Sequence, residues 1–252
     1  MQIPLNIIHN YIGLIVMGSL SIDLLRRNRK HPNTTTLQLG LATLCATITT
    51  FFFGIPVLFT QDTQTISAWT FVGEVTQIAA MLFMWQIVIR AAFSLKPRLK
   101  GAATASVFLI AAASIAEAVH RNFTPPYSAS VLVRADNTIA VVYTNTMAYQ
   151  ILNSINSLAL LALGLYFLKE ANLAKLQSQR FRTRGIAIGF VIASCSFIFT
   201  AALPIDKQLP FSVTVLSVAF LIIAIVGIIS LRMMRLEREL SDTSSTNGPA
   251  NS

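Results

Sequence analysis

Polar side chains that could bind a ligand or exchange a proton lie inside long apolar segments of this sequence. Ionisable and amide groups are costly in hydrocarbon, so within a membrane segment they are the default functional candidates. The candidate ligand-binding residues are carboxylates, histidines and amides, namely Glu74, Gln77, Glu117, His120, Gln150, Asn153, Asn156, His9 and Asn10. Three of these amides, Gln150, Asn153 and Asn156, are spaced by three and share one stripe of a helix.

The two carboxylates raise the question of compensating charge. Burial of Glu74 or Glu117 in an apolar bundle favours the neutral acid, unless His120 or Arg121 supplies a positive charge nearby. The alternative for the amides is a structural role, because amides between membrane helices often serve only as hydrogen-bond links worth about 0.6 kcal/mol each. Both interpretations remain open from the sequence.

The sequence lacks the residue patterns that several classes of enzyme and metal site require. The sequence has no HExxH, GxSxG or P-loop motif, no pair of intramembrane aspartates, and no lysine in its last apolar segment for a retinal Schiff base. The two cysteines, Cys45 and Cys195, lie in apolar segments without the spacing of a metal site. The sequence therefore predicts no enzyme, no catalytic or metal-binding residue and no cofactor.

The amino-acid composition indicates that most of the chain, including these polar groups, lies in a lipid bilayer. Apolar residues make up 54% of the chain and charged residues only 12%, about half of the usual quarter. A helix needs about 20 mostly apolar residues to cross a bilayer core. Such segments occur at 5–25, 36–59, 68–93, 102–119, 142–168, 186–203 and 211–233. We therefore expect an all-α membrane protein, a seven-transmembrane helix bundle over residues 1–240 with a disordered cytoplasmic tail over 241–252, and the lipid bilayer as its main partner.

The basic residues predict the orientation. Sixteen of the nineteen lie at the end of the first, third, fifth or seventh segment or follow it, and the exceptions are Arg121, Arg134 and Lys207. Lys and Arg accumulate on the cytoplasmic side of membranes, so the sequence predicts a cell-membrane protein with its N-terminus outside and its C-terminus in the cytoplasm. This placement accounts for the net charge of +9 without a nucleic-acid partner.

Two links between the segments are long. Pro125 and Pro126 stop a helix, and the two β-branched runs that follow them predict a small extracellular β-hairpin between the fourth and fifth helices. The alternative is a disordered loop. The second link, 169–184, is rich in helix-forming residues and predicts a helical extension.

The candidate residues share one depth in the predicted membrane. At 1.5 Å per residue, Glu74 lies about 9 Å from the outer end of the third segment, and the other candidates lie in the outer half or near the centre. We infer a polar cavity open to the outside, with walls from the first, third, fourth and fifth segments.

The layout resembles the seven-transmembrane sensory region of the histidine kinase N-terminal 7TM type, found in bacterial signalling proteins. The residues that carry the resemblance are the basic step 26–30, the enlarged link with 131–143, and the stretch 179–189 that leads into the sixth segment. The resemblance implies a sensor that transmits through its last helix. Because a polar tail follows Leu240 in place of an output domain, we expect a separate cytoplasmic or membrane signalling partner, a fragment of a longer protein, or a protein that is not a sensor.

The leading hypothesis is an integral membrane sensor or receptor-like protein. It would bind a small-molecule ligand or protons in the outward-facing cavity and signal through its last helix. The alternative is a transporter, a channel or an accessory subunit of a membrane complex that uses the same polar stripe as a pathway. A third hypothesis is a structural assembly partner.

Overall fold

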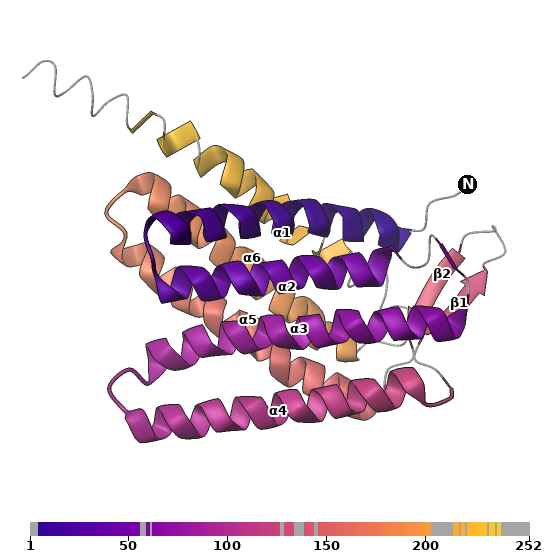
Figure 1. Cartoon of the computed structure of the whole chain (residues 1–252). Helices are drawn as coiled ribbons and strands as arrows, with labels where there is room; N and C mark the ends of the chain where they lie inside the picture. Colours follow the sequence, from indigo (N-terminus) through magenta and orange to yellow (C-terminus); the bar gives the residue numbers. More distant parts are fainter. Residues whose placement is uncertain are drawn as a thin grey trace, which may run out of the picture.

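The computed structural model is a bundle of long α-helices (Figure 1). It describes residues 5–55, 59–60, 62–126, 129–133, 139–143, 146–202, 214–216, 218–219, 221–230, 232–234 and 236–237. The helices are α1 (Leu5–Lys30), α2 (Thr34–Gly54), α3 (Thr63–Ala92), α4 (Pro97–Phe123), α5 (Met147–Leu173) and α6 (Gln177–Ala202). A further helical stretch, Thr214–Met234, follows α6; we call it the last helix.

The helices have the length and composition of membrane spans. Within the described residues, six are long and apolar enough to cross a bilayer: α2, α3, α4, α5, the part of α6 over Gln177–Phe199, and the last helix. The 26 residues of α1 extend about 39 Å, and the side chains of its residues 5–10 lie outside the described part. Large apolar side chains such as Phe108 and Leu109 of α4 are 51% and 72% exposed, a surface suited to lipid. The chain is a multi-pass membrane protein.

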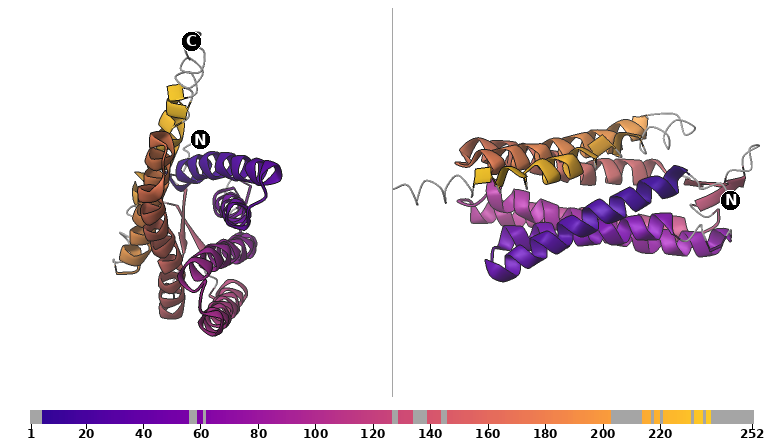
Figure 2. Two further views of the ribbon diagram at one scale, coloured as in Figure 1. Left: turned by 90° about the vertical axis from the view of Figure 1, so that its left-hand side faces the viewer. Right: turned by 90° about the horizontal axis from the view of Figure 1, so that it is seen from above.

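Consecutive helices pack against each other and reverse direction at each turn. Contacts join α1 to α2, α2 to α3, α3 to both α4 and α5, and α5 to α6. The turns α1–α2, α3–α4 and α5–α6 meet at one end of the bundle (Figure 1), which we call the basic end because it carries Arg26–Lys30, Lys96–Lys100 and Lys175–Arg184. Seen end-on, α5, α6 and the last helix form one layer, and α1 to α4 form the other (Figure 2).

Two short strands lie at the opposite end, the hairpin end, between α4 and α5. Strand β1 (Ala129–Val133) pairs antiparallel with β2 (Ile139–Tyr143), with Val131 opposite Val141, and β1 contacts α3. The predicted turn between them falls in 134–138, outside the described residues. Strand β2 occupies positions that the sequence assigned to the fifth span, and α5 begins only at Met147. Thr146 caps it there, because its Oγ1 accepts a hydrogen bond from the Tyr149 N–H at 3.1 Å.

Several helix boundaries differ from the sequence expectation. Helix α5 does not continue as an extension through 169–184: it ends at Leu173, Ala174 is extended, and α6 begins at Gln177. Helix α2 ends at Gly54, short of the predicted 59. Helix α4 begins with Pro97 in its first turn and continues to Phe123, beyond the predicted 119, and this last difference shapes the candidate site.

Apolar packing and small polar residues hold the helices together. The core joins α2, α3, α5 and α6 through buried side chains that include Ala42, Met84, Leu163 and Phe190. Between helices, the Ser21 hydroxyl donates to the Gly40 carbonyl at 3.1 Å and the Ser194 hydroxyl donates to the Ser157 carbonyl at 2.8 Å. Such links add modest stability to membrane helix pairs.

The last helix packs closely on α6 at two glycines four residues apart. A Cβ atom at Gly189 would lie 2.5 Å from Cγ1 of Ile223, and one at Gly185 would overlap Val226. Small residues at this spacing let two membrane helices approach closely. The pair Gly185 and Gly189 therefore positions the last helix.

Candidate functional site

A buried ion pair between α3 and α4 forms the centre of the candidate site. Glu74 of α3 is only 4% exposed and Arg121 of α4 only 5%, and Nη2 of Arg121 donates to Oε1 of Glu74. The second carboxylate oxygen accepts a hydrogen bond of 2.7 Å from Nδ2 of Asn122, which also donates to the Ala118 carbonyl at 2.9 Å. Both oxygens of Glu74 are thus engaged by α4.

The extra turn of α4 explains how Arg121 reaches Glu74. The buried residues of this helix recur at a spacing of three or four and form one stripe: Ala111, Ser114, Ala118, Arg121 and Asn122. This finding corrects the end of the fourth segment at 119, which left Arg121 outside the helix. It also decides between the two cations considered from the sequence, because His120 is exposed while Arg121 faces the carboxylate.

An aromatic ring from α5 closes the other side of the arginine. Cζ of Arg121 lies 3.9 Å from the centroid of the Tyr149 ring, within the range of a cation–π interaction, which is worth about 2 kcal/mol when desolvated. Tyr149 stands in the first turn of α5. The arginine therefore joins three helices at the hairpin end.

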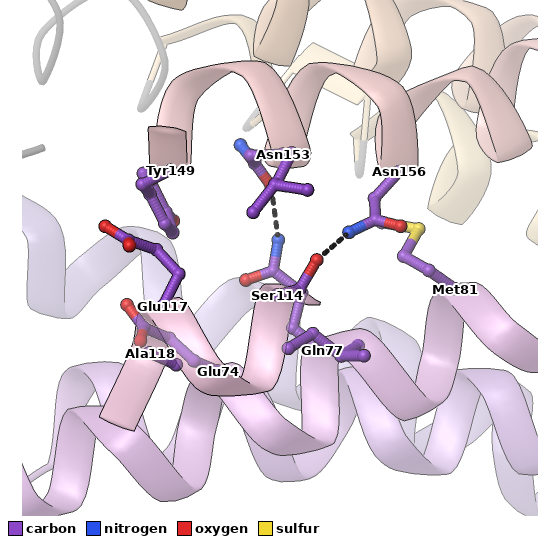
Figure 3. A pocket seen from close by; sticks show the side chains of 11 residues that line it. Glu74, Gln77, Met81, Ser114, Glu117, Ala118, Tyr149, Asn153 and Asn156 are labelled. Atoms are coloured by element: carbon purple, nitrogen blue, oxygen red, sulfur yellow. Dashed lines mark hydrogen bonds between the residues drawn. The ribbon is translucent and has the colours of Figure 1, made fainter. Parts of the chain in front are cut away.

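The amide side chains connect the same three helices one to two turns deeper. Nε2 of Gln77 donates to Oδ1 of Asn153 at 3.3 Å, and Nδ2 of Asn156 donates to Oγ of Ser114 at 3.2 Å. Figure 3 shows Asn153 and Asn156 pointing from α5 toward these partners on α3 and α4. Gln77 and Asn153 therefore bond to each other and Asn156 bonds to a serine hydroxyl across the helices, and all three amides line the space between them.

The space enclosed by these groups is small. A cavity of about 30 Å³ lies between α3, α4 and α5, and a buried water needs about 10–15 Å³ on this measure, so one or two water molecules fit. Its lining is shared by the three helices (Figure 3): Glu74, Gln77, Ile78, Met81, Ser114, Glu117, Ala118, Tyr149, Leu152, Asn153 and Asn156.

Glu117 lies at the mouth of the cavity. It is partly buried and accepts a hydrogen bond from Oγ1 of Thr146, the residue that caps α5. One carboxylate of the site is thus paired in the interior, and the other ties the end of α4 to the start of α5.

The remaining candidates from the sequence do not join the lining. Gln150 and His120 are absent from it, and the side chains of His9 and Asn10 lie outside the described part of the chain. The first helix was expected to form one wall, but all lining residues come from α3, α4 and α5. The expected four-walled cavity is therefore a three-helix site over the described residues.

Besides the apolar lining residues, five contributing residues were not among the sequence candidates: Ser114, Arg121, Asn122, Thr146 and Tyr149. A signal for Arg121 was present, because a carboxylate buried in hydrocarbon needs a cation at a similar depth, and Arg121 follows the fourth segment by two residues. Asn122 then follows from the same helical face. Tyr149 carried no comparable signal.

No family model, curated protein or solved structure matches this chain. Among the described residues, no group of three His, Cys, Asp or Glu side chains is placed to hold a metal ion. The ion pair, its aromatic cover and the cavity beside them are the features that bear on function.

Proposed function

We propose that this protein is a membrane sensor or receptor-like protein of the seven-transmembrane sensory kind, with its hairpin end outside the cell and its basic end in the cytoplasm. The basic residues support the orientation through the positive-inside rule. The observation that carries the proposal is the buried Glu74–Arg121 pair, because it joins three helices beside a small polar cavity at the end that would face the stimulus.

A buried ion pair is suited to a two-state element. Removing one partner of such a pair costs about 3–5 kcal/mol, an energy large enough to invert the populations of two helix packings. A proton on Glu74, or a small anionic ligand that replaces Glu74 as the partner of Arg121, would weaken the link between α3 and α4. Helix packings that separate these groups would then gain population.

The packing offers a route from this pair to the last helix. Tyr149 and the amides connect the site to α5, α5 contacts α6, and α6 holds the last helix at Gly185 and Gly189. At the basic end, Ser178 of α6 donates hydrogen bonds to Glu237 from its backbone N–H at 3.1 Å and from its hydroxyl at 2.5 Å. A change in α5 and α6 would therefore reach the segment that faces a cytoplasmic partner.

The pathway alternative has less support. The cavity admits one or two waters, and toward the basic end it borders the apolar core around Met81 and Met84. A transporter or channel would have to open this layer during its cycle. The sensor hypothesis requires only a change in helix packing.

The test measures whether a change at the pair alters the opposite end. In a variant without Cys45 and Cys195, spin labels at the exposed positions Leu99 and Leu236 would report the distance between α4 and the end of the last helix in lipid nanodiscs. We expect Glu74→Gln to change this distance distribution. The matched control is Asp62→Asn, an exposed helix cap at the hairpin end where asparagine serves as well.

The same proteins in sealed vesicles separate the two functions. A sensor gives a changed distance distribution without proton or solute flux. An unchanged distribution contradicts the sensor proposal, and a flux that Glu74→Gln abolishes favours the pathway instead.

A further inference from the structure

A large apolar groove lies between α1 on one side and α6 and the last helix on the other, in the half of the bundle near the basic end. Its volume is about 590 Å³, within the range of about 300–1,000 Å³ typical of small-molecule sites. Apolar side chains dominate its surface, among them Ile15, Leu20, Leu24, Phe167, Ile223 and Ile228. Ile15 and Ile228 are 64% and 60% exposed, so the groove opens toward the surrounding lipid.

Charged residues line only one end of this groove. Asp23 and Arg27 of α1 form an ion pair of 2.8 Å one helical turn apart, and Arg182 of α6 faces them across the groove. Two arginines against one aspartate leave an excess of positive charge there. The adjoining end of α1 adds Arg26, Arg29 and Lys30.

Arg182 differs from the arginines on either side of it. Arg180 donates to the Ala174 carbonyl at 3.0 Å, and Arg184 donates to Oδ1 of Asn172 at 2.9 Å. Arg182 is partly buried, yet no hydrogen bond or ion pair joins it to any other residue that the structure describes. A partly buried guanidinium without an acceptor among the described residues favours binding of an anion.

The groove has the length of one membrane leaflet. Ile15 and Arg27 are twelve residues apart on α1, which corresponds to about 18 Å at 1.5 Å per residue. Half of a bilayer core is about 15 Å. The apolar part of the groove thus extends toward the middle of the membrane, and the arginines lie at the level of the headgroups.

We propose that this groove binds an anionic phospholipid, with an acyl chain along the apolar side chains and the phosphate between Arg182 and Arg27. Basic sites between membrane helices are known places for anionic headgroups, and arginine can bind phosphate through two parallel hydrogen bonds. A second copy of the chain would bring its own basic end to the same place, so charge repulsion disfavours that occupant.

The proposal is independent of the sensor function. The groove is lined mainly by α1, α6 and the last helix, with Leu39 of α2 and Phe167 of α5, and it shares no lining residue with the cavity beside the ion pair. A bound lipid would join α1 to the last helix and could set the resting position of that helix. Either proposal can fail while the other stands.

The test compares two lipids that differ only in headgroup. Native mass spectrometry of the full chain would measure binding of phosphatidylglycerol and phosphatidylcholine with identical acyl chains. We expect clear preference for phosphatidylglycerol, and we expect Arg182→Gln to weaken its binding about tenfold, the effect of losing a hydrogen bond between charged groups. The matched control is Arg184→Gln, which removes the same charge two residues away and should change binding less than about twofold.

A second variant and a competitor separate the other occupants. Ala224→Phe would fill the apolar part of the groove without changing its charge, so it should also weaken phosphatidylglycerol binding. Inorganic phosphate should not compete, because it lacks the acyl chain. Equal binding of both lipids, equal effects of the Arg182 and Arg184 variants, competition by inorganic phosphate, or a dimer that Ala224→Phe dissociates would each overturn the proposal.

Discussion

Each end of the bundle holds an arginine that is at least partly buried, and the two arginines differ in their partners. At the hairpin end, Arg121 is 5% exposed, paired with Glu74 and covered by Tyr149. At the basic end, Arg182 is partly buried beside a groove of about 590 Å³ and has no ion pair with a described residue. The charge of Arg121 is thus neutralised by a partner within the protein, whereas the charge of Arg182 has no counter-charge in an ion pair with a described residue.

This difference separates a structural element from a binding site. A charge neutralised inside the protein fixes the relative position of the helices that supply the two partners, and its removal leaves the other charge buried. A charge left open at headgroup level has water or lipid phosphate as its partner, so its removal costs the fold little. Substitutions at the two arginines should therefore have unequal effects.

The largest effect is expected from Arg121→Met. It removes the cation and leaves Glu74 buried without a partner charge, so we expect a loss of about 3–5 kcal/mol in the free energy of unfolding. Chemical unfolding in detergent micelles would measure it. Arg182→Met, at the arginine without an ion pair to a described residue, should change the free energy of unfolding by less than about 1 kcal/mol. Equal losses for the two variants would contradict the difference between a structural and a binding arginine.

The next largest effect is expected where the last helix packs on α6. Gly189→Leu would push a side chain into Ile223 of the last helix, and overpacking of this kind costs about 1–3 kcal/mol. Thermal unfolding of the full chain would measure it. Gly101→Ala is the matched control, since a Cβ atom there meets nothing within 4 Å; a loss of stability at Gly101 equal to that at Gly189 would argue against close packing of the last helix.

A smaller effect tests the aromatic cover of Arg121. Tyr149→Phe keeps the ring and should retain most of the interaction, whereas Tyr149→Leu should lower stability by about 1–2 kcal/mol. The comparison of the two variants isolates the ring from the hydroxyl. Similar losses for both would assign the effect to the hydroxyl and not to the cation–π contact.

The smallest effect is expected at Glu237, a partly exposed carboxylate of the basic end. Hydrogen bonds from the hydroxyl and then the backbone N–H of Ser178 lower the pKa of Glu237 below its ordinary value of 4.5. A pKa that is lower in the folded state than in the unfolded state adds to the free energy of unfolding. This addition is fully present above the unfolded-state pKa and is lost as the pH falls through the folded-state pKa. In a carbon NMR titration, Ser178→Ala should return the pKa of Glu237 toward its ordinary value. An unchanged pKa in this variant would contradict the hydrogen bond between Ser178 and Glu237.

Hydropathy and charge were sufficient to predict the helical membrane bundle, since long apolar segments and the basic loops between them are local properties of the chain. Glu74 was also identifiable, because a carboxylate within an apolar segment stands out. Its partner was narrowed to His120 or Arg121 but not decided, since hydropathy falls at Glu117 and the fourth segment was ended at 119. Arg121 can lie in the interior because it pairs with Glu74, which is distant in the sequence and on another helix.

The groove at the basic end was beyond sequence reasoning for a different reason. Its lining comes from positions near 20, 182 and 225, which no local pattern relates to one another. Arg182 itself looked like one more basic residue of a cytoplasmic link. Only the close approach of the last helix to α6, and the position of α1 opposite them, distinguishes it from Arg180 and Arg184.

A double-mutant cycle on Glu74 and Arg121 tests the central claim most directly. Unfolding free energies would be measured for the unchanged chain, Glu74→Gln, Arg121→Gln and the double variant. An ion pair buried and desolvated as described should give a coupling energy of about 2 kcal/mol or more. A coupling energy indistinguishable from zero would contradict the account, because the two groups would then be independent.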